Sequence, residues 1–267
     1  MMSLLREIYQ RRELLYNLTV RELKIRYRGS VLGFLWTLLI PLFMALIYVV
    51  FLRMLAGRGV PMTEIIIGVF AWQFTVQSVN SGLHSITGNA NLVKKVFIPR
   101  IILPLASTLA NLVNYLLSLI VQIPLIAVLQ SMQGGGLSGW LVLMPVMILV
   151  HFLFNLALAL LLAGSNVYFR DLEHLVGVGL SAWFFMSPVM YNLSFVQRLA
   201  ADIPWAMSAY LLNPLAGIVT AYRSLALPEL DMVWTLPVAI SLVFVLFLFF
   251  FSVRLFMRLQ RNFADLL

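Results

Sequence analysis

Residues 101–169 read IILPLASTLANLVNYLLSLIVQIPLIAVLQSMQGGGLSGWLVLMPVMILVHFLFNLALALLLAGSNVYF, and this stretch contains no Asp, Glu, Lys or Arg. A transmembrane helix needs about 20 predominantly apolar residues, so the stretch is too long for one helix. Polar residues and three consecutive glycines interrupt it between Gln130 and Gly139, and such a segment is typical of a turn. We therefore predict two membrane-spanning helices, over residues 101–129 and 140–166.

The composition extends this interpretation to the whole chain. Hydrophobic residues make up 62% of the 267 positions and charged residues 10%, whereas soluble domains carry about 25% charged residues. Lipid is therefore the expected surrounding of most of the chain, and we predict an all-α integral membrane protein with six transmembrane helices. The other four predicted spans lie between Arg28 and Arg53, between Glu64 and Lys94, from His174 to Tyr191, and from Met232 to Val253.

Basic residues are distributed unevenly around these spans. With six spans, fourteen Lys and Arg residues lie on the side that holds both termini and four lie on the other side. Cytoplasmic loops carry an excess of basic residues, so both termini are expected in the cytoplasm. We predict that residues 192–231 form one or two short helices that dip into the outer face, because a seventh span would place the basic C-terminal tail outside.

We predict a single domain with three parts. Residues 1–28 form an amphipathic helix in the cytoplasmic membrane interface, residues 29–253 form the six-span bundle, and residues 254–267 form a cytoplasmic tail. A solvated basic leader is the alternative for residues 1–28, which are too rich in charge for a cleavable signal. The apolar positions that favour the interfacial helix are Leu4, Ile8, Leu15 and Leu18.

Two of the predicted spans carry polar residues at helical spacing. Such residues face another helix or a water-filled cavity, because lipid offers them no hydrogen bonds. Two interpretations are open, namely hydrogen bonds between helices and a translocation surface that binds hydroxyl groups. The residues are Gln73, Gln77, Asn80 and His84 on the second span, and Ser107, Asn111, Asn114 and Ser118 on the third.

Aromatic residues are concentrated on the first and fifth predicted spans. Core packing and interfacial belts are one explanation. The other is a pore whose aromatic rings stack on the C–H faces of sugars. The candidates for channel lining are Phe34, Trp36, Tyr48, Trp183, Phe184 and Tyr191.

A cluster of basic residues precedes the first span. Attraction to anionic lipids explains such a cluster, and recognition of a pyrophosphate-linked lipid head group is the alternative, because guanidinium groups bind phosphate strongly. The basic residues of the chain flank apolar runs, so we expect no nucleic-acid partner despite the net charge of +8. The candidate head-group residues are Arg21, Lys24, Arg26 and Arg28.

The sequence lacks the residues and motifs that several kinds of chemistry require. The chain has no cysteine, and no Asp or Glu lies within a predicted span, whereas ion-coupled transporters usually need an intramembrane carboxylate. Only His84 and His151 could replace one. There is no P-loop, HExxH or GxSxG motif. We therefore predict no catalytic residues, no metal site and no cofactor in this chain, and any energy for transport would come from a partner.

Four blocks of sequence carry further information through their order. They are RELKIRYRGSVLGFLWTLLIPL (21–42), NANLVKKVFIPRIILPLASTLANLVNY (89–115), NVYFRDLEHLVGVGLSAWFFMSPVMY (166–191) and LNPLAGIVTAYRSLAL (212–227). Together they resemble the ABC-2 class of permeases that export O-antigen, capsule or teichoic-acid polysaccharides, and the resemblance covers nearly the whole chain. It implies a six-helix subunit of the bacterial cytoplasmic membrane, with an interface helix and outer-face gate helices.

The resemblance also implies partners. Such permeases form homodimers and bind two cytoplasmic ATP-binding subunits, which hold ATP and Mg²⁺. The loop between the second and third spans docks onto the ATPase, and here that loop is Gly88–Pro99, with Asn89 expected to cap the docking helix. The expected coupling residues are Asn91, Leu92, Val93, Lys94 and Lys95, with Arg170 and Asp171 in the other cytoplasmic loop.

We therefore expect a permease subunit that moves a lipid-linked polysaccharide to the outer face of the membrane. An ABC-2 exporter of a drug or a simple lipid is the nearest alternative. A secondary transporter or channel without an ATPase partner is another, and a membrane-embedded transferase is the most distant.

Overall fold

The computed structural model describes residues 2–56, 60–95, 98–201, 203, 205–230 and 236–267, and the regular elements within these residues are all helical. The α-helices are α1 Met2–Gln10, α2 Arg12–Tyr27, α3 Leu35–Ala56, α4 Met62–His84, α5 Ala90–Lys95, α6 Ile102–Ser131, α7 Met144–Asn166, α8 Leu172–Phe185, α9 Leu193–Leu199, α10 Ala206–Leu211, α11 Pro214–Ala226, α12 Leu236–Leu259 and α13 Phe263–Leu266. Short 3₁₀ helices cover Thr87–Asn89, Gly139–Leu143 and Gln260–Asn262.

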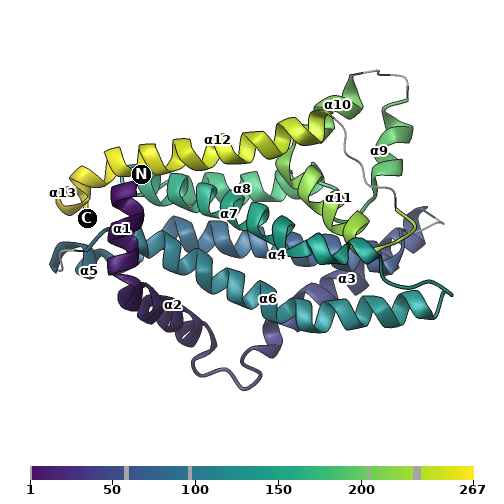
Figure 1. Cartoon of the computed structure of the whole chain (residues 1–267), viewed down its shortest axis with the longest axis horizontal. Helices are drawn as coiled ribbons and strands as arrows, with labels where there is room; N and C mark the ends of the chain where they lie inside the picture. The colour runs from purple at the N-terminus through teal and green to yellow at the C-terminus, as the bar shows by residue number, and fades with distance from the viewer. Residues whose placement is uncertain (1, 57–59, 96–97, 202, 204, 231–235) are drawn as a thin grey trace.

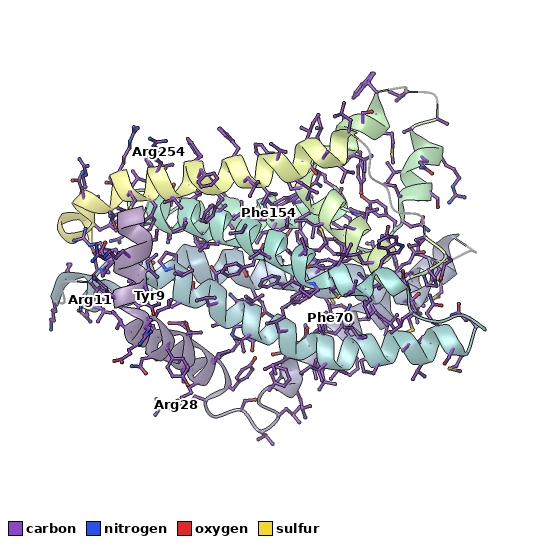
Figure 2. All side chains as sticks on the ribbon, viewed as in Figure 1. Tyr9, Arg11, Arg28, Phe70, Phe154 and Arg254 are labelled. Carbon is purple, nitrogen blue, oxygen red and sulfur yellow. The ribbon has the colours of Figure 1, made fainter. Side chains whose placement is uncertain are left out.

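The long helices form an elongated bundle. Figure 1 shows α4, α6, α7 and α12 running along its length, with both chain termini, α5 and α13 at one end and α9, α10 and α11 at the other. Large side chains such as Phe70 and Phe154 are buried inside the bundle, whereas Arg11, Arg28 and Arg254 lie on its surface (Figure 2).

Three helical segments among the described residues are long and apolar enough to cross a membrane, namely Ile102–Ser131, Gly139–Asn166 and Val238–Asn262. The first two match the spans predicted within residues 101–169, and the third matches the last predicted span, whose first residues lie outside the described part of the chain. Two shorter apolar helices are Leu35–Phe51 and Leu172–Phe185. α4 has 23 residues, but its polar residues lower its mean hydropathy.

The fifth predicted span differs from the prediction at its end. α8 has 14 residues and stops at Phe185 instead of continuing to Tyr191. Pro188 explains the early end, because proline lacks the backbone N–H and disfavours helical geometry at the preceding residue. The chain then turns and bends through residues 186–191 before α9.

The segments predicted to flank the bundle are packed against it. The leader forms two helices that meet at Arg11, and Ile8, Leu15 and Leu18 pack against the hydrophobic core, with α2 lying along α6. The side chain of Leu4 lies outside the described part. At the other end, residues 192–231 hold three short helices within their described portion, and α11 is buried along most of its length.

α4 and α7 form the centre of the bundle. Thr75 Oγ1 lies 2.8 Å from His151 Nε2, and Asn166 Nδ2 donates to the carbonyl oxygen of Leu83 at 3.1 Å, so residue numbers rise together along the two helices. Between these contacts, a Cβ atom added at Gly82 would overlap Ala159. Small residues at such contacts let membrane helices approach closely, so α4 and α7 pack as one parallel unit.

Candidate functional site

Three of the polar residues predicted on α4 and α6, namely Gln77, Asn111 and Asn114, meet the end of α2. Arg26 donates from Nη1 to Gln77 Oε1 at 2.9 Å and from Nη2 to Asn111 Oδ1 at 2.6 Å, and Asn111 Nδ2 donates to Ser81 Oγ at 2.7 Å. The guanidinium loses part of its hydration there, which lowers the pKa of Arg26 below its ordinary value of 12.5. For Gln77 and Asn111, the structure therefore shows hydrogen bonds between helices.

Tyr27 continues this network toward α3. Its hydroxyl donates to Asn114 Oδ1 at 2.9 Å and lies 2.6 Å from Thr37 Oγ1. Its ring makes an edge contact with Phe34, with the centroids 6.1 Å apart. Asn111 and Asn114 of α6 thus hold α2 and the start of α3 in place, whereas Ser107 and Ser118 donate to carbonyl oxygens within α6.

Arg21 joins α2 to the loop after α4. Its Nη2 atom donates to Asn89 Oδ1 at 2.6 Å and lies 3.1 Å from Glu22 Oε1, while Asn89 Nδ2 donates to the carbonyl oxygen of Ser85 at 2.9 Å. The prediction that Asn89 caps the docking helix is wrong, because the side-chain oxygen that would cap α5 accepts the bond from Arg21 instead.

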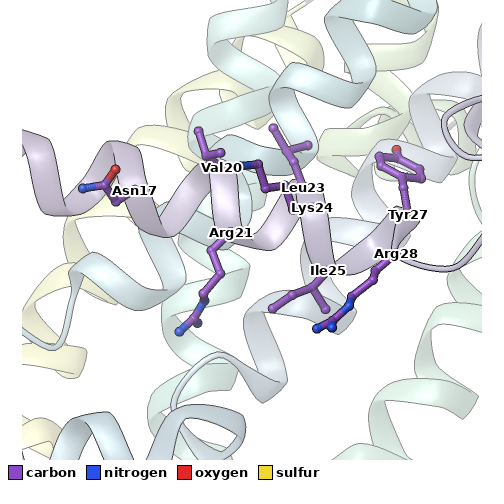
Figure 3. Close-up of a pocket in the computed structure, with 8 residues that line it drawn as sticks. All are labelled: Asn17, Val20, Arg21, Leu23, Lys24, Ile25, Tyr27 and Arg28. Carbon is purple, nitrogen blue, oxygen red and sulfur yellow. The ribbon is translucent and has the colours of Figure 1, made fainter.

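The four candidate head-group residues therefore separate into two kinds. Arg21 and Arg26 form hydrogen bonds with other helices, whereas Lys24 and Arg28 form no hydrogen bond or ion pair with the described residues; Lys24, Arg26 and Arg28 are all exposed. A hollow of about 890 Å³ runs along α2. Figure 3 shows Arg21 and Arg28 extending to the same side of α2, with Ile25 between them. The hollow is lined by Asn17, Val20, Arg21, Leu23, Lys24, Ile25, Tyr27 and Arg28.

Half of the candidate channel aromatics form one cluster. Phe184 lies 5.5 Å from Tyr48 and 5.5 Å from Trp72, and Trp72 lies 6.4 Å from Trp183, all between ring centroids. Trp72 was not among the predicted residues, because only the aromatics of the first and fifth spans were considered, although Phe70, Trp72 and Phe74 lie close together on the second. Phe34 precedes α3 and contacts Tyr27, and Trp36 lies in the first turn of α3 and is exposed, so neither belongs to this cluster.

Tyr191 belongs to a second aromatic hollow, at the end of the bundle that holds α9 and α10. The hollow measures about 610 Å³. Tyr210 donates to the hydroxyl of Tyr191 at 3.2 Å, and Trp183 Nε1 donates to Asn213 Oδ1 at 3.0 Å. Rings, hydroxyls and an amide therefore surround one space. The lining residues include Trp183, Phe185, Tyr191, Phe195, Tyr210 and Asn213.

The candidate coupling residues lie at the other end of the bundle. Lys94, Lys95 and Asn91 are exposed on α5, whereas Val93 is buried in the core and so faces away from any docking surface. Leu92 is half-buried.

Arg170 and Asp171 are exposed just before α8. No ion pair forms between these two side chains in the described structure. His84 Nε2 lies 3.7 Å from Glu173 Oε1, so the end of α4 lies beside the start of α8.

A buried charge pair was missed by the sequence argument. Arg223 of α11 donates from Nε to the carbonyl oxygen of Glu64 at 3.0 Å, from Nη1 to that of Tyr191 at 2.8 Å, and from Nη2 to that of Val189 at 3.1 Å. The structure places Glu64 inside the first turn of α4 and buries it, so this carboxylate is not outside the helical span as predicted. A buried carboxylate is tolerated beside a buried cation.

Comparison with known proteins adds an independent finding. Residues 13–227 match the family described as ABC-2 type transporter. The chain is 41% identical over 178 residues to the O-antigen export system permease protein RfbA of Myxococcus xanthus, covering 66% of this chain and 67% of the relative. It is 30% identical over 167 residues to the protein of the same name from Klebsiella pneumoniae, covering 61% and 63%. The matched part thus spans about two thirds of each relative.

Proposed function

Because this chain belongs to the ABC-2 type transporter family, we propose that it is the membrane-spanning permease subunit of an ATP-driven exporter of lipid-linked polysaccharide. The observation that carries the proposal is the 41% identity to a protein named as an O-antigen export permease. The direction of transport is from the cytoplasmic to the outer face. The multi-pass helical bundle with long apolar helices supports this placement in the bacterial inner membrane.

The proposed topology has six spans in a single domain, with both termini in the cytoplasm. Long or apolar helices supply the spans, namely α3, α4, α6, α7, α8 and α12. The bundle end with α5, α13 and both termini (Figure 1) then faces the cytoplasm, and α9 to α11 act as gate helices at the outer face. The basic residues at the first end agree with the positive-inside rule.

The partners follow from the family. An ABC-2 permease works with an ATP-binding subunit, and the proposed assembly is a homodimer of this chain with two such subunits. ATP and Mg²⁺ bind to the partner, in keeping with the absence of a P-loop from this sequence. Lys94 and Lys95 on α5, together with Arg170 and Asp171 just before α8, form the proposed docking surface.

The proposed transport path uses the residues that the fold leaves free. Lys24 and Arg28 bind the phosphate groups of the lipid carrier at the hollow along α2, since phosphate needs unpaired cations. The sugars then pass the aromatic cluster around Phe184 and the outer hollow at Tyr191, where rings and hydroxyls match the two faces of a sugar.

The test is affinity purification of the tagged chain from its host in mild detergent, with mass spectrometry of the proteins that come with it. Recovery of an ATP-binding subunit at one-to-one stoichiometry supports the exporter. Absence of any ATPase from a chain that stays dimeric would contradict it. Deletion of the chain should also remove a surface polysaccharide, whereas an exporter of a drug or simple lipid would leave the polysaccharide unchanged.

A further inference from the structure

The C-terminal turns fold back onto the cytoplasmic loops. Phe263 of α13 is fully buried, with its ring centroid 5.6 Å from that of Phe256 and 6.4 Å from that of Tyr168. The hydroxyl of Tyr168 donates to the carbonyl oxygen of Leu259 at 3.0 Å. The end of α12 is therefore anchored to the loop that follows α7.

The same turns also bind the docking loop between α4 and α6. Arg100 Nη1 donates to the carbonyl oxygen of Gln260, and its guanidinium lies over the ring of Phe263, 6.0 Å from the centroid. α13 itself contacts α5. Both loops that carry candidate coupling residues thus meet on residues 259–263.

The contact between α13 and α5 brings exposed basic residues of both segments to the same end of the bundle. Lys94, Lys95 and Arg261 are exposed, and Arg261 lies between the anchor points Gln260 and Phe263. Figure 1 shows α5 and α13 beyond the ends of α4 and α6, at the same end of the bundle. A surface in that position faces a partner outside the membrane more readily than lipid head groups.

We propose that the C-terminal turn Gln260–Leu266 is a second docking element for the ATP-binding subunit, with Arg261 contacting an acidic surface of that subunit beside Lys94 and Lys95. This inference rests on the proposed function. The family match ends at residue 227, so the C-terminal turn lies outside the matched region, whereas Lys94 and Lys95 lie within it. Movement of the ATPase would then reach α12 directly through Phe263, and not only α4 and α6 through the docking loop.

The absence of cysteine from the chain allows a direct test with single cysteines. Arg261→Cys, Lys94→Cys and Gln197→Cys are each purified with and without the ATP-binding subunit that copurifies with the unsubstituted chain, and the rate of maleimide labelling is measured. All three side chains are exposed, and Gln197 on α9 lies at the opposite end, as a matched control. The subunit should slow labelling several-fold at positions 261 and 94 and leave position 197 unchanged.

The outcomes separate the two proposals. Protection at position 94 with unchanged labelling at 261 would overturn the C-terminal contact and leave the exporter assignment standing. Protection at neither position would overturn the docking role of both α5 and the C-terminal turn, whereas failure of the chain to copurify with any ATP-binding subunit would contradict the exporter assignment itself. The same labelling is repeated without the subunit in nanodiscs containing phosphatidylglycerol, and protection of position 261 there would assign this surface to anionic lipid and overturn the proposal.

Discussion

Arg223 and Glu64 are paired inside the protein, with Arg223 Nε 3.0 Å from the carbonyl oxygen of Glu64 and 4.0 Å from its carboxylate oxygen Oε2. The guanidinium is therefore held mainly by backbone oxygens, and the carboxylate oxygen Oε2 has no hydrogen-bond partner among the described residues. The two residues are 159 positions apart and join α4 to α11. Because Arg223 makes three hydrogen bonds to backbone oxygens whereas Glu64 Oε2 makes none, substitutions of the two residues should destabilise the protein to different extents.

We expect Arg223→Ala to destabilise the protein far more than Glu64→Gln. Loss of Arg223 leaves three carbonyl oxygens and a carboxylate buried without their cation, and breaking a buried pair in this way costs about 3–5 kcal/mol. Glu64→Gln removes the charge but keeps the backbone bonds. Thermal unfolding in detergent measures both, with exposed Arg198→Ala as the control. Equal losses from the two substitutions would show that the side-chain ion pair, not the backbone bonding, dominates.

Gly82→Leu should separate α4 from α7. A Cβ atom at position 82 already overlaps Ala159, and overpacking of a tight contact costs about 1–3 kcal/mol. Because α4 and α7 lead to the two cytoplasmic loops, ATPase-driven export should fall together with stability. Gly177→Leu is the control, since nothing lies within 4 Å of a Cβ atom there. A Gly82→Leu protein as stable as the control would contradict the close packing.

Arg26→Gln and Arg28→Gln should fail in different ways. Arg26 is exposed but makes two hydrogen bonds to neighbouring helices, and exposed charged contacts contribute up to about 1 kcal/mol each, so its loss lowers the melting temperature. Arg28 is exposed, and surface substitutions usually change stability by less than about 0.5 kcal/mol. Export of polysaccharide should nevertheless fall in Arg28→Gln, and wild-type export by that variant would remove Arg28 from the head-group site.

Phe263→Ala should loosen the C-terminal turn without unfolding the bundle. Removing a fully buried phenylalanine costs about 3–5 kcal/mol locally, and the bonds from Arg100 and Tyr168 to the turn would weaken with it. Limited proteolysis should then cleave the chain after α12 faster than in the unsubstituted protein, while the melting temperature of the bundle changes little. Phe247→Ala, on an exposed face of α12, provides the comparison. Unchanged proteolysis would show that Phe263 does not anchor the turn.

The sequence was informative where one residue or one local pattern decides the structure. The uncharged stretch 101–169 with its glycine-rich interruption predicted two helices that the structure contains, because charge and turn residues act locally. Helical spacing also predicted that the polar side of α6 would face protein, since lipid cannot satisfy it. Pro188 was a visible signal for the end of α8, although the prediction carried the span to Tyr191.

The sequence did not indicate which polar and charged residues bond to one another in the fold. Arg26 stood among four basic residues of equal appearance, and only the fold brings it to Gln77, which is 51 positions away. Asn89 had the residue type and place of a helix cap, but a distant arginine competes for its oxygen. Glu64 served only to mark the start of the second predicted span, and Arg223 was one of the charges within residues 192–231. Nothing local in the sequence marks a pair that forms only when α11 packs against α4.

The end of α8 before Pro188 limits which amino-acid sequences α11 can have. Beyond Phe185 the backbone carbonyls have no next helical turn to accept from, and α11 or its cap supplies the donors instead: Asn213 to Met186, and Arg223 to Val189 and Tyr191. In a lipid environment these oxygens have no water to turn to. α11 and its cap thus supply the hydrogen-bond donors for the irregular segment 186–191. A replacement helix that keeps the apolar face of α11 but lacks donors at positions 213 and 223 would leave the carbonyl oxygens of this segment without hydrogen-bond partners.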